Sequence, residues 1–102
     1  MSAYVISEVR PLDAELVERY RTLAAASVAQ YGGRYLVRGG DLTAVEGEWP
    51  DGFSVIVLEF PSMEAARRWY DSPEYGEALR VRRAGALERR LVFVEGHDDS
   101  GS

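Results

Sequence analysis

The chain has 102 residues, of which 46% are hydrophobic, and it carries a formal charge of −5 at pH 7. This length suits one domain, and the apolar content is sufficient for a core. All 12 basic residues are arginine, and cysteine is absent. The composition therefore excludes disulfides, thiolate nucleophiles, Schiff-base chemistry and a P-loop, and the negative charge argues against nucleic acid or a membrane as partner.

The two ends of the chain predict a single domain with a short tail. No segment reaches the roughly 20 apolar residues of a membrane span, and the first ten residues do not resemble a signal peptide, so we expect a cytoplasmic protein. Residues 1–96 are expected to form the domain, and residues 97–102 a flexible C-terminal tail. His97 is the only histidine, so we expect it to be solvated without a function, and we expect no metal and no cofactor.

The beginning of the chain predicts a strand followed by a helix. Residues 3–9 are rich in β-branched and aromatic side chains, which favour a strand. Asp13 is the expected N-cap of a helix that ends at Gly32-Gly33, because glycine tolerates the left-handed conformation there. Between these ends, apolar and small side chains recur every three or four residues, as an amphipathic helix requires; they are Leu16, Tyr20, Leu23, Ser27 and Tyr31.

The middle of the chain predicts two strands joined by a loop. A strand begins at Arg34, the glycine pair 39–40 indicates a bulge or a close backbone approach, and residues 42–45 are expected to resume the strand. Residues 46–52 form the expected hairpin loop. Residues 53–60 form the next strand.

The last third of the chain predicts helical segments and a final strand. Ser62 is the expected cap of a short helix, and Ser72 followed by Pro73 begins another helix that runs to about Ala86. Residues 91–95 form the last expected strand. The resulting order, βαββαβ, predicts an α+β ferredoxin-like fold, with a four-stranded antiparallel sheet and helices on one face.

The strand at residues 53–60 is apolar on both sides. Val55 and Val57 face one way, whereas Ile56, Leu58 and Phe60 face the other. An antiparallel sheet with one wet face should alternate apolar and polar residues. Two helices cover only one face, so we expect a second copy of the chain to cover the other, burying about 800 Å² per partner. The sequence therefore predicts a homodimer formed through the sheet face.

Arg38 and Glu59 are the first candidate functional residues. If the hairpin closes near Trp49-Pro50, the two side chains lie beside each other on neighbouring strands. A charged pair in apolar strands is either a structural ion pair or the polar end of a pocket. In the second case Arg38 would bind a carboxylate or an enolate, and Glu59 would orient the ligand or move a proton.

A group of aromatic residues with polar tips is the second candidate. Such residues either pack the core or line an apolar pocket that carries a few hydroxyl groups. If they line a pocket, they are the expected substrate-binding residues Tyr20, Tyr35, Trp49, Trp69, Tyr70 and Tyr75.

A run of arginines precedes the last strand. It comprises Arg80, Arg82, Arg83, Arg89 and Arg90. A nucleic-acid face would require an exposed pair of aromatic residues on the sheet, and the central strand offers valines and a glutamate instead. We therefore expect these arginines to pair with Glu74, Glu77 and Glu88 on a solvated helix face.

Several segments from Ala3 to Gly96 resemble the domain-of-unknown-function family 1330. They read AYVISEV, YGGRYLVRGG, EGEWP, VIVLEFPSMEAARRWYDSPEY and VFVEG. The resemblance implies a ferredoxin-like subunit of the dimeric α/β-barrel superfamily. It also implies that a cleft is surrounded by Tyr20, Arg38, Glu46, Trp49, Glu59, Trp69, Tyr70 and Tyr75.

The chain departs from that family pattern at two places. Family members often have histidine where this chain has Tyr31, and arginine where it has Gly52-Phe53. A proton-transfer role for that histidine would not carry over. The wider superfamily includes cofactor-independent monooxygenases, polyketide cyclases, muconolactone isomerases and haem-binding enzymes, of which haem binding is least expected without a suitable histidine.

Together these observations predict a homodimer that binds a small molecule in each subunit. The leading hypothesis is a cofactor-independent enzyme of the isomerase, cyclase or monooxygenase type that acts on an aromatic or enolisable compound. The alternative is a non-catalytic dimeric binding or accessory protein whose polar pairs hold the fold together.

Overall fold

The computed structural model of the chain describes residues 1–97; residues 98–102 of the expected tail lie outside it. Within the described part, four strands and three α-helices follow one another in the predicted order. They are β1 (Ala3–Pro11), α1 (Ala14–Gln30), β2 (Arg34–Arg38), β3 (Ser54–Phe60), α2 (Met63–Tyr70), α3 (Pro73–Val81) and β4 (Leu87–Glu95), with the wide turn η1 (Arg82–Ala86) between α3 and β4. The predicted ferredoxin-like fold is confirmed.

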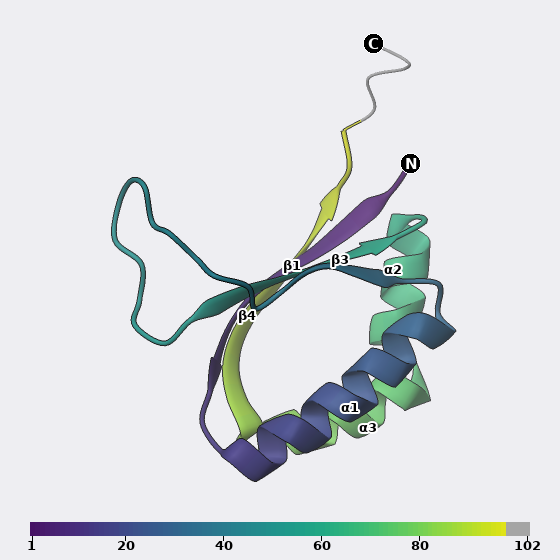
Figure 1. The fold of residues 1–102 in the computed structure, drawn as a ribbon. Helices are drawn as coiled ribbons and strands as arrows, with labels where there is room; N and C mark the ends of the chain where they lie inside the picture. The colour runs from purple at the N-terminus through teal and green to yellow at the C-terminus, as the bar shows by residue number, and fades with distance from the viewer. Residues whose placement is uncertain (98–102) are drawn as a thin grey trace.

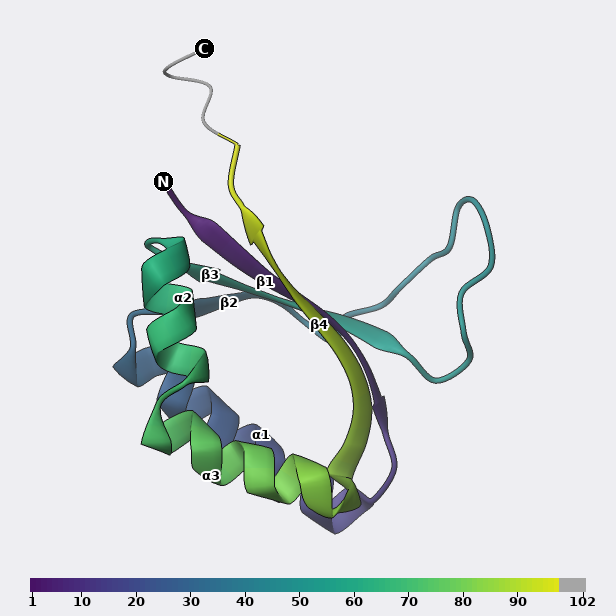
Figure 2. The same cartoon turned by 180° about the vertical axis from the view of Figure 1, so that it is seen from behind.

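The strands form one antiparallel sheet in the order β2-β3-β1-β4. The sheet is curved, and all three α-helices lie on its concave side, as Figures 1 and 2 show from opposite directions. The convex side, called here the outer face, has no helix over it in either view. Within residues 1–97, no helix combines the length and the apolar character needed to cross a membrane.

The three α-helices begin at the residues that the sequence indicates. The side chains of Asp13, Ser62 and Ser72 each accept a hydrogen bond from the backbone N–H three residues later. These bonds satisfy N–H groups that have no partner inside the helix. After α3, the backbone leaves the helical conformation within η1 at Gly85, whose φ of 107° lies in the left-handed region that favours glycine.

The core lies between the concave side of the sheet and the helices. Along β1 the residues at positions 3, 5, 7 and 9 are buried, whereas Ile6 is exposed on the outer face. Trp69 and Tyr75 are the largest buried side chains, and they reach the core from α2 and α3. The alternation on β1 therefore shows which side of this strand faces the helices.

The outer face carries a row of aliphatic side chains that crosses all four strands. Val37 pairs with Val57, Val57 with Ile6, and Ile6 with Val92. Three of these four residues are at least one third exposed. Cross-strand ion pairs, Arg34–Glu59, Arg10–Glu88 and Arg90–Glu8, lie on the same face. The position of Val57 in this row confirms that β3 is apolar on its outer side as well as on its helix side.

The segment after β2 differs from the prediction. Residues 42–45 do not resume the strand; residues 39–53 form a long loop that projects away from the rest of the domain (Figure 1). The bulge lies at Leu36 in β2, where the register shifts between Tyr35 and Val37, and not at the glycine pair. Gly39 instead ends the strand, with φ of 70° and a backbone hydrogen bond to Val55.

Candidate functional site

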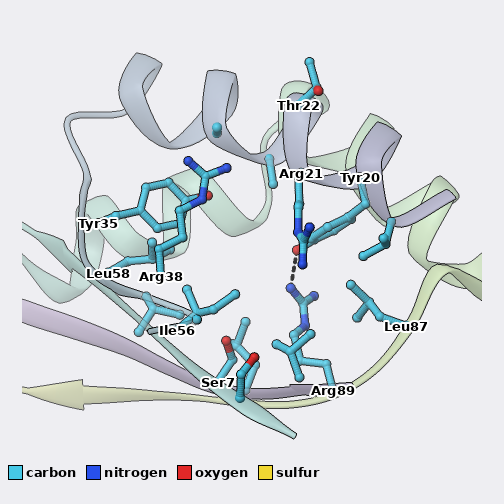
Figure 3. A pocket seen from close by; sticks show the side chains of 18 of the residues that line it. Ser7, Tyr20, Arg21, Thr22, Tyr35, Arg38, Ile56, Leu58, Leu87 and Arg89 are labelled. Carbon is cyan, nitrogen blue, oxygen red and sulfur yellow. Dashed lines mark hydrogen bonds between the residues drawn. The ribbon is translucent and has the colours of Figure 1, made fainter. Parts of the chain in front are cut away.

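A cavity of about 570 Å³ lies between the concave side of the sheet and α1. Ligand pockets commonly measure about 300–1,000 Å³, so this volume suits a small molecule. Its floor is mostly aliphatic and comes from all four strands, whereas α1 provides the opposite wall (Figure 3). The polar side chains that line it are Ser7, Glu18, Tyr20, Arg21, Thr22, Tyr35, Arg38, Ser54, Trp69 and Arg89.

The bulge in β2 places Arg38 in this cavity. Residues three apart in a regular strand face opposite sides of the sheet. The extra residue, Leu36, changes this alternation, so that Tyr35 lies opposite Leu58 and Arg38 lies opposite Ile56, both on the helix side. The Arg38 guanidinium stacks over the Tyr35 ring at 4.4 Å from the ring centroid. Burial raises the pKa of the Tyr35 hydroxyl, and the Arg38 charge offsets part of that rise.

Arg89 enters the cavity from β4, the other edge strand. Its guanidinium donates hydrogen bonds to the hydroxyl oxygens of Tyr20 and Tyr75, and these two hydroxyls are 2.8 Å apart. Tyr75 is completely buried, whereas Tyr20 lines the cavity. The three side chains, from β4, α1 and α3, are called here the Arg89 cluster. Figure 3 shows Arg89 directed toward Tyr20.

The Arg89 cluster keeps its cation in a partly buried setting. Burial by itself lowers the pKa of Arg89, but the two neighbouring tyrosines outweigh this effect, and the pKa of Arg89 is raised overall. Burial also raises the pKa of the Tyr75 hydroxyl well above its ordinary value of 10.0. The cluster therefore combines the Arg89 cation with the hydroxyl groups of Tyr20 and Tyr75.

The cavity carries an excess of positive charge. Arg21 forms an ion pair with Glu18 at 2.9 Å on the exposed surface of α1. Among residues 1–97, no carboxylate lies within ion-pair distance of Arg38 or of Arg89. Partly buried charges are usually compensated, so the unpaired Arg89 provides an environment for an anionic ligand, and the exposed Arg38 adds a second positive charge to the cavity lining.

The predicted neighbourhood of Arg38 and Glu59 is wrong. Glu59 lies opposite Arg34, and the two form an ion pair at 2.7 Å on the outer face. The hydrogen bond from Arg34 is the main reason that the pKa of the Glu59 carboxyl is lowered. The expectation failed because it assumed that the strands close near Trp49, whereas the loop of residues 39–53 and the bulge at Leu36 set a different register.

The predicted aromatic residues separate into three groups. Tyr20, Tyr35 and Trp69 line the cavity, and Tyr75 lies behind it in the Arg89 cluster. Tyr70 packs against Trp69, Tyr75 and Phe93 instead. Trp49 lies in the projecting loop, where its indole N–H donates to the Phe53 carbonyl at 2.9 Å.

The resemblance also placed Glu46 around the cleft. Glu46 is exposed in the projecting loop, outside the cavity. Trp69 contributes to both the core and the cavity, because its indole N–H is fixed by the Ser27 hydroxyl at 3.0 Å while the residue lines the cavity wall. Tyr31, which replaces the family histidine, donates to Glu74 at 2.7 Å.

Arg89 is the site residue that the sequence interpretation missed. The sequence pattern predicts a solvated helix face for Arg89 and its neighbours, which holds for Arg80 and its partner Glu77 at 3.7 Å. The strand begins at Leu87, four residues earlier than predicted, so Arg89 belongs to the sheet. Strand alternation could have separated it from Arg90, because Leu87, Arg89 and Leu91 share one side. Within residues 1–97, no three histidine or carboxylate side chains gather as a metal site would require.

Solved structures with the same fold include proteins of known and unknown function. A protein of unknown function from Rhodopseudomonas palustris is 20% identical, with a TM-score of 0.76 over 95% of this chain and 83% of that one. The cofactor-independent oxygenase SnoaB from Streptomyces nogalater is 16% identical, with a TM-score of 0.66 over 99% and 98%. A dimeric ferredoxin-like protein of unknown function from Jannaschia sp. CCS1 is 13% identical, with a TM-score of 0.70 over 94% and 100%.

These similarities are low in sequence and therefore show the fold alone. Among functionally curated proteins, none matches the sequence. The family model for a domain of unknown function, DUF1330, matches residues 2–97, which include every strand and helix of the fold, Arg38 and Arg89. The chain belongs to the DUF1330 family.

Proposed function

We propose that this chain binds an anionic small molecule in the cavity and promotes a cofactor-independent reaction of an aromatic or enolisable compound. The reaction would be an isomerisation, a cyclisation or an oxygenation. The observation that carries the proposal is the pair of cavity arginines, Arg38 and Arg89, which have no carboxylate partner among residues 1–97. An oxygenation type is further supported by the fold shared with SnoaB.

The Arg89 cluster suits the stabilisation of a developing oxyanion. Its two tyrosine hydroxyls have two hydrogens, of which one is used in the bond between them. If Tyr75 donates to Tyr20, the Tyr20 hydrogen is available to a ligand oxygen in the cavity. When a C–H proton beside a carbonyl leaves to water, negative charge develops on the carbonyl oxygen, and Tyr20 and Arg89 would stabilise it.

The position of Arg38 supports its predicted catalytic role, whereas the position of Glu59 does not. Arg38 keeps its proposed role, because it lines the cavity and would bind a carboxylate or an enolate oxygen. Glu59 lies on the outer face beside Arg34, so its position gives no support to a role as base or orienting group. Tyr20, Tyr35 and Trp69 would shape the bound molecule.

We also propose that residues 1–96 act as a single domain that forms a cytoplasmic homodimer. The row Val37, Val57, Ile6 and Val92 supports the dimer, since a continuous apolar row on an uncovered sheet face is the kind of surface that a second copy would bury. The dimeric ferredoxin-like protein from Jannaschia, which has the same fold, gives additional support.

A non-catalytic binding protein is the second candidate. Within residues 1–97, Glu18 is the carboxylate that lines the cavity, and it is paired with Arg21. This arrangement provides anion binding without an evident general base. The two candidates therefore share the binding site and differ in whether a bound compound reacts.

Two measurements test the proposal in sequence. Calorimetric titration should detect binding of benzoate and little binding of benzamide, its neutral analogue; equal binding of both would contradict an anion site. Phenylpyruvate, an enolisable aromatic acid, should then exchange its C3 hydrogens for deuterium faster with the protein than in buffer. A Tyr20→Phe variant should lose this acceleration, whereas Tyr70→Phe should keep it. Binding of phenylpyruvate with exchange at the buffer rate would favour the non-catalytic candidate.

A further inference from the structure

The two cavity arginines come from opposite edges of the sheet. Arg38 lies on β2 and Arg89 on β4, which are the two edge strands in the order β2-β3-β1-β4. Both side chains face the concave side and line the same cavity. Figure 3 shows them at separate places along it, Arg38 beside Tyr35 and Arg89 beneath Tyr20.

The strand register shows how far apart the backbones of Arg38 and Arg89 lie across the sheet. Arg38 lies opposite Ile56, Ile56 opposite Ser7, and Ser7 opposite Leu91, so one cross-strand row runs from β2 to β4. Arg89 is two residues from Leu91 on the same side of β4. Three strand spacings of about 4.8 Å place the two edge backbones about 14 Å apart. Each guanidinium therefore reaches the cavity from its own edge.

The space between the two arginines is mainly apolar. Ile56, Leu58 and Leu91 form part of its floor, and Ser7 adds one hydroxyl group. The third arginine of the lining, Arg21, is already paired with Glu18. A ligand with a single anionic group would neutralise one edge and leave the other arginine without a counter-charge.

The two arginines differ in how firmly they are held. Hydrogen bonds to Tyr20 and Tyr75 hold the Arg89 guanidinium in place, so it is preorganised to bind an anion. Arg38 is exposed and rests on the Tyr35 ring without a hydrogen bond to it. Arg89 would therefore hold the first acidic group, and Arg38 would add affinity only for a ligand that reaches it.

We propose that the cavity selects compounds with two acidic groups at opposite ends of a ring-sized apolar body. Aromatic dicarboxylates and hydroxy-carboxylates whose hydroxyl ionises belong to this class. One acidic group would lie at Arg89 and the other at Arg38, with the apolar body over Ile56 and Leu91. This inference rests on the proposed function, because it assigns a ligand class to the same cavity.

Calorimetric titration with two matched pairs of acids tests the inference. The pairs are benzoate with benzene-1,4-dicarboxylate, and 2-naphthoate with naphthalene-2,6-dicarboxylate, so that ring size and charge vary separately. In at least one pair, the dicarboxylate should bind at least about tenfold more tightly than the mono-acid, equivalent to about 1.4 kcal/mol. The Arg38→Gln variant should remove this advantage, so that the dicarboxylate and the mono-acid of each pair bind with affinities within about threefold of each other.

A matched control separates a local effect from a change in overall charge. Arg68 on α2 is exposed and paired with Glu64, away from the cavity, so Arg68→Gln should keep the full advantage of the dicarboxylate. Thermal unfolding should show that Arg38→Gln remains folded, because Arg38 is exposed. If the mono-acids bind but neither dicarboxylate gains affinity, the inference is overturned and the proposed anion site stands. If none of the four acids binds, the proposed function itself fails, and this inference with it.

Discussion

Arg38 stacks on Tyr35, which precedes it by three residues in the same strand. In a regular strand these side chains would lie on opposite faces of the sheet. They share a face because Leu36 is an extra residue in β2. Tyr35 and Val37 pair with two consecutive residues of β3, which leaves Leu36 between them without a partner. One additional residue in an edge strand thus places Arg38 in the cavity.

Deleting Leu36 is expected to move Arg38 from the cavity to the outer face. A one-residue change of register exchanges the two faces of a strand. In the deletion variant, a second change, Arg38→Gln, should therefore no longer alter the affinity for an aromatic dicarboxylate, measured by calorimetry. Deleting Gly40, which lies in the loop beyond β2, is the matched control and should preserve the effect of Arg38→Gln. An unchanged effect in the Leu36 deletion would show that the bulge does not direct Arg38.

Removing the Tyr75 hydroxyl is expected to destabilise the fold. Tyr75→Phe deprives Arg89 and Tyr20 of a buried hydrogen-bond partner, which should lower the free energy of unfolding by about 1–3 kcal/mol. Tyr70→Phe is the control, because the Tyr70 ring packs nearby, and it should change the free energy of unfolding by less than about 0.5 kcal/mol. Urea denaturation measures both values. Equal values for the two variants would argue against a structural contribution from the Arg89 cluster.

A charge placed in the aliphatic row of the outer face is expected to prevent self-association. Ile6 lies between Val57 and Val92 in that row, so Ile6→Asp would bring like charges together in a symmetric dimer. Light scattering at micromolar concentration should give twice the chain mass of 11.4 kDa for the wild type and 11.4 kDa for the variant. Val45→Asp changes an 88% exposed valine in the projecting loop and should remain dimeric. A monomeric wild type would disprove the proposed dimer.

The Arg34–Glu59 pair is expected to stabilise the fold only at pH values at which the Glu59 carboxyl is ionised. The hydrogen bond from Arg34 lowers the pKa of Glu59 below its ordinary value of 4.5, while burial opposes this change. A carboxyl whose pKa is lower in the folded state stabilises the fold above its unfolded pKa, and the effect is lost as the pH falls through the folded value. Arg34→Gln should therefore lower the free energy of unfolding at about pH 7 and have little effect at about pH 2.

The same charge pair offers its own control. In a Glu59→Gln background, Arg34→Gln should have no pH-dependent effect, because the titrating carboxyl is absent. Carbon-detected NMR titration should also show that the pKa of Glu59 rises when Arg34 is replaced. A pKa that stays the same would mean that Arg34 is not its cause.

Two glycine-to-alanine changes are expected to have opposite signs. A Cβ at Gly33 would lie 2.6 Å from the buried Phe60 ring, so Gly33→Ala should destabilise the fold by about 1–3 kcal/mol. A Cβ at Gly76, inside α3, would meet no atom within 4 Å, so Gly76→Ala should stabilise the fold by up to about 1 kcal/mol. Thermal unfolding measures the sign of each change. Destabilisation of similar size at both sites would contradict the packing argument at Gly33.

Local sequence patterns predicted most of the fold. The caps at Asp13, Ser62 and Ser72 and the alternating apolar residues depend on neighbours within a few positions, so they can be read along the chain. The same holds for the apolar character of both sides of β3, which indicated an uncovered sheet face. These features determine the order of the strands and helices and much of the core.

The composition of the cavity depended on the tertiary structure. Whether Arg38 lies opposite Glu59 or Ile56 depends on the register across a long loop and on a bulge, and a one-residue difference exchanges the faces. Arg89 meets Tyr20 and Tyr75 only because β4, α1 and α3 pack together. The sequence by itself thus determined that arginine and tyrosine are the polar groups available. Packing over long sequence separations decided which of them share a cavity, because such contacts leave no periodic signal in the chain.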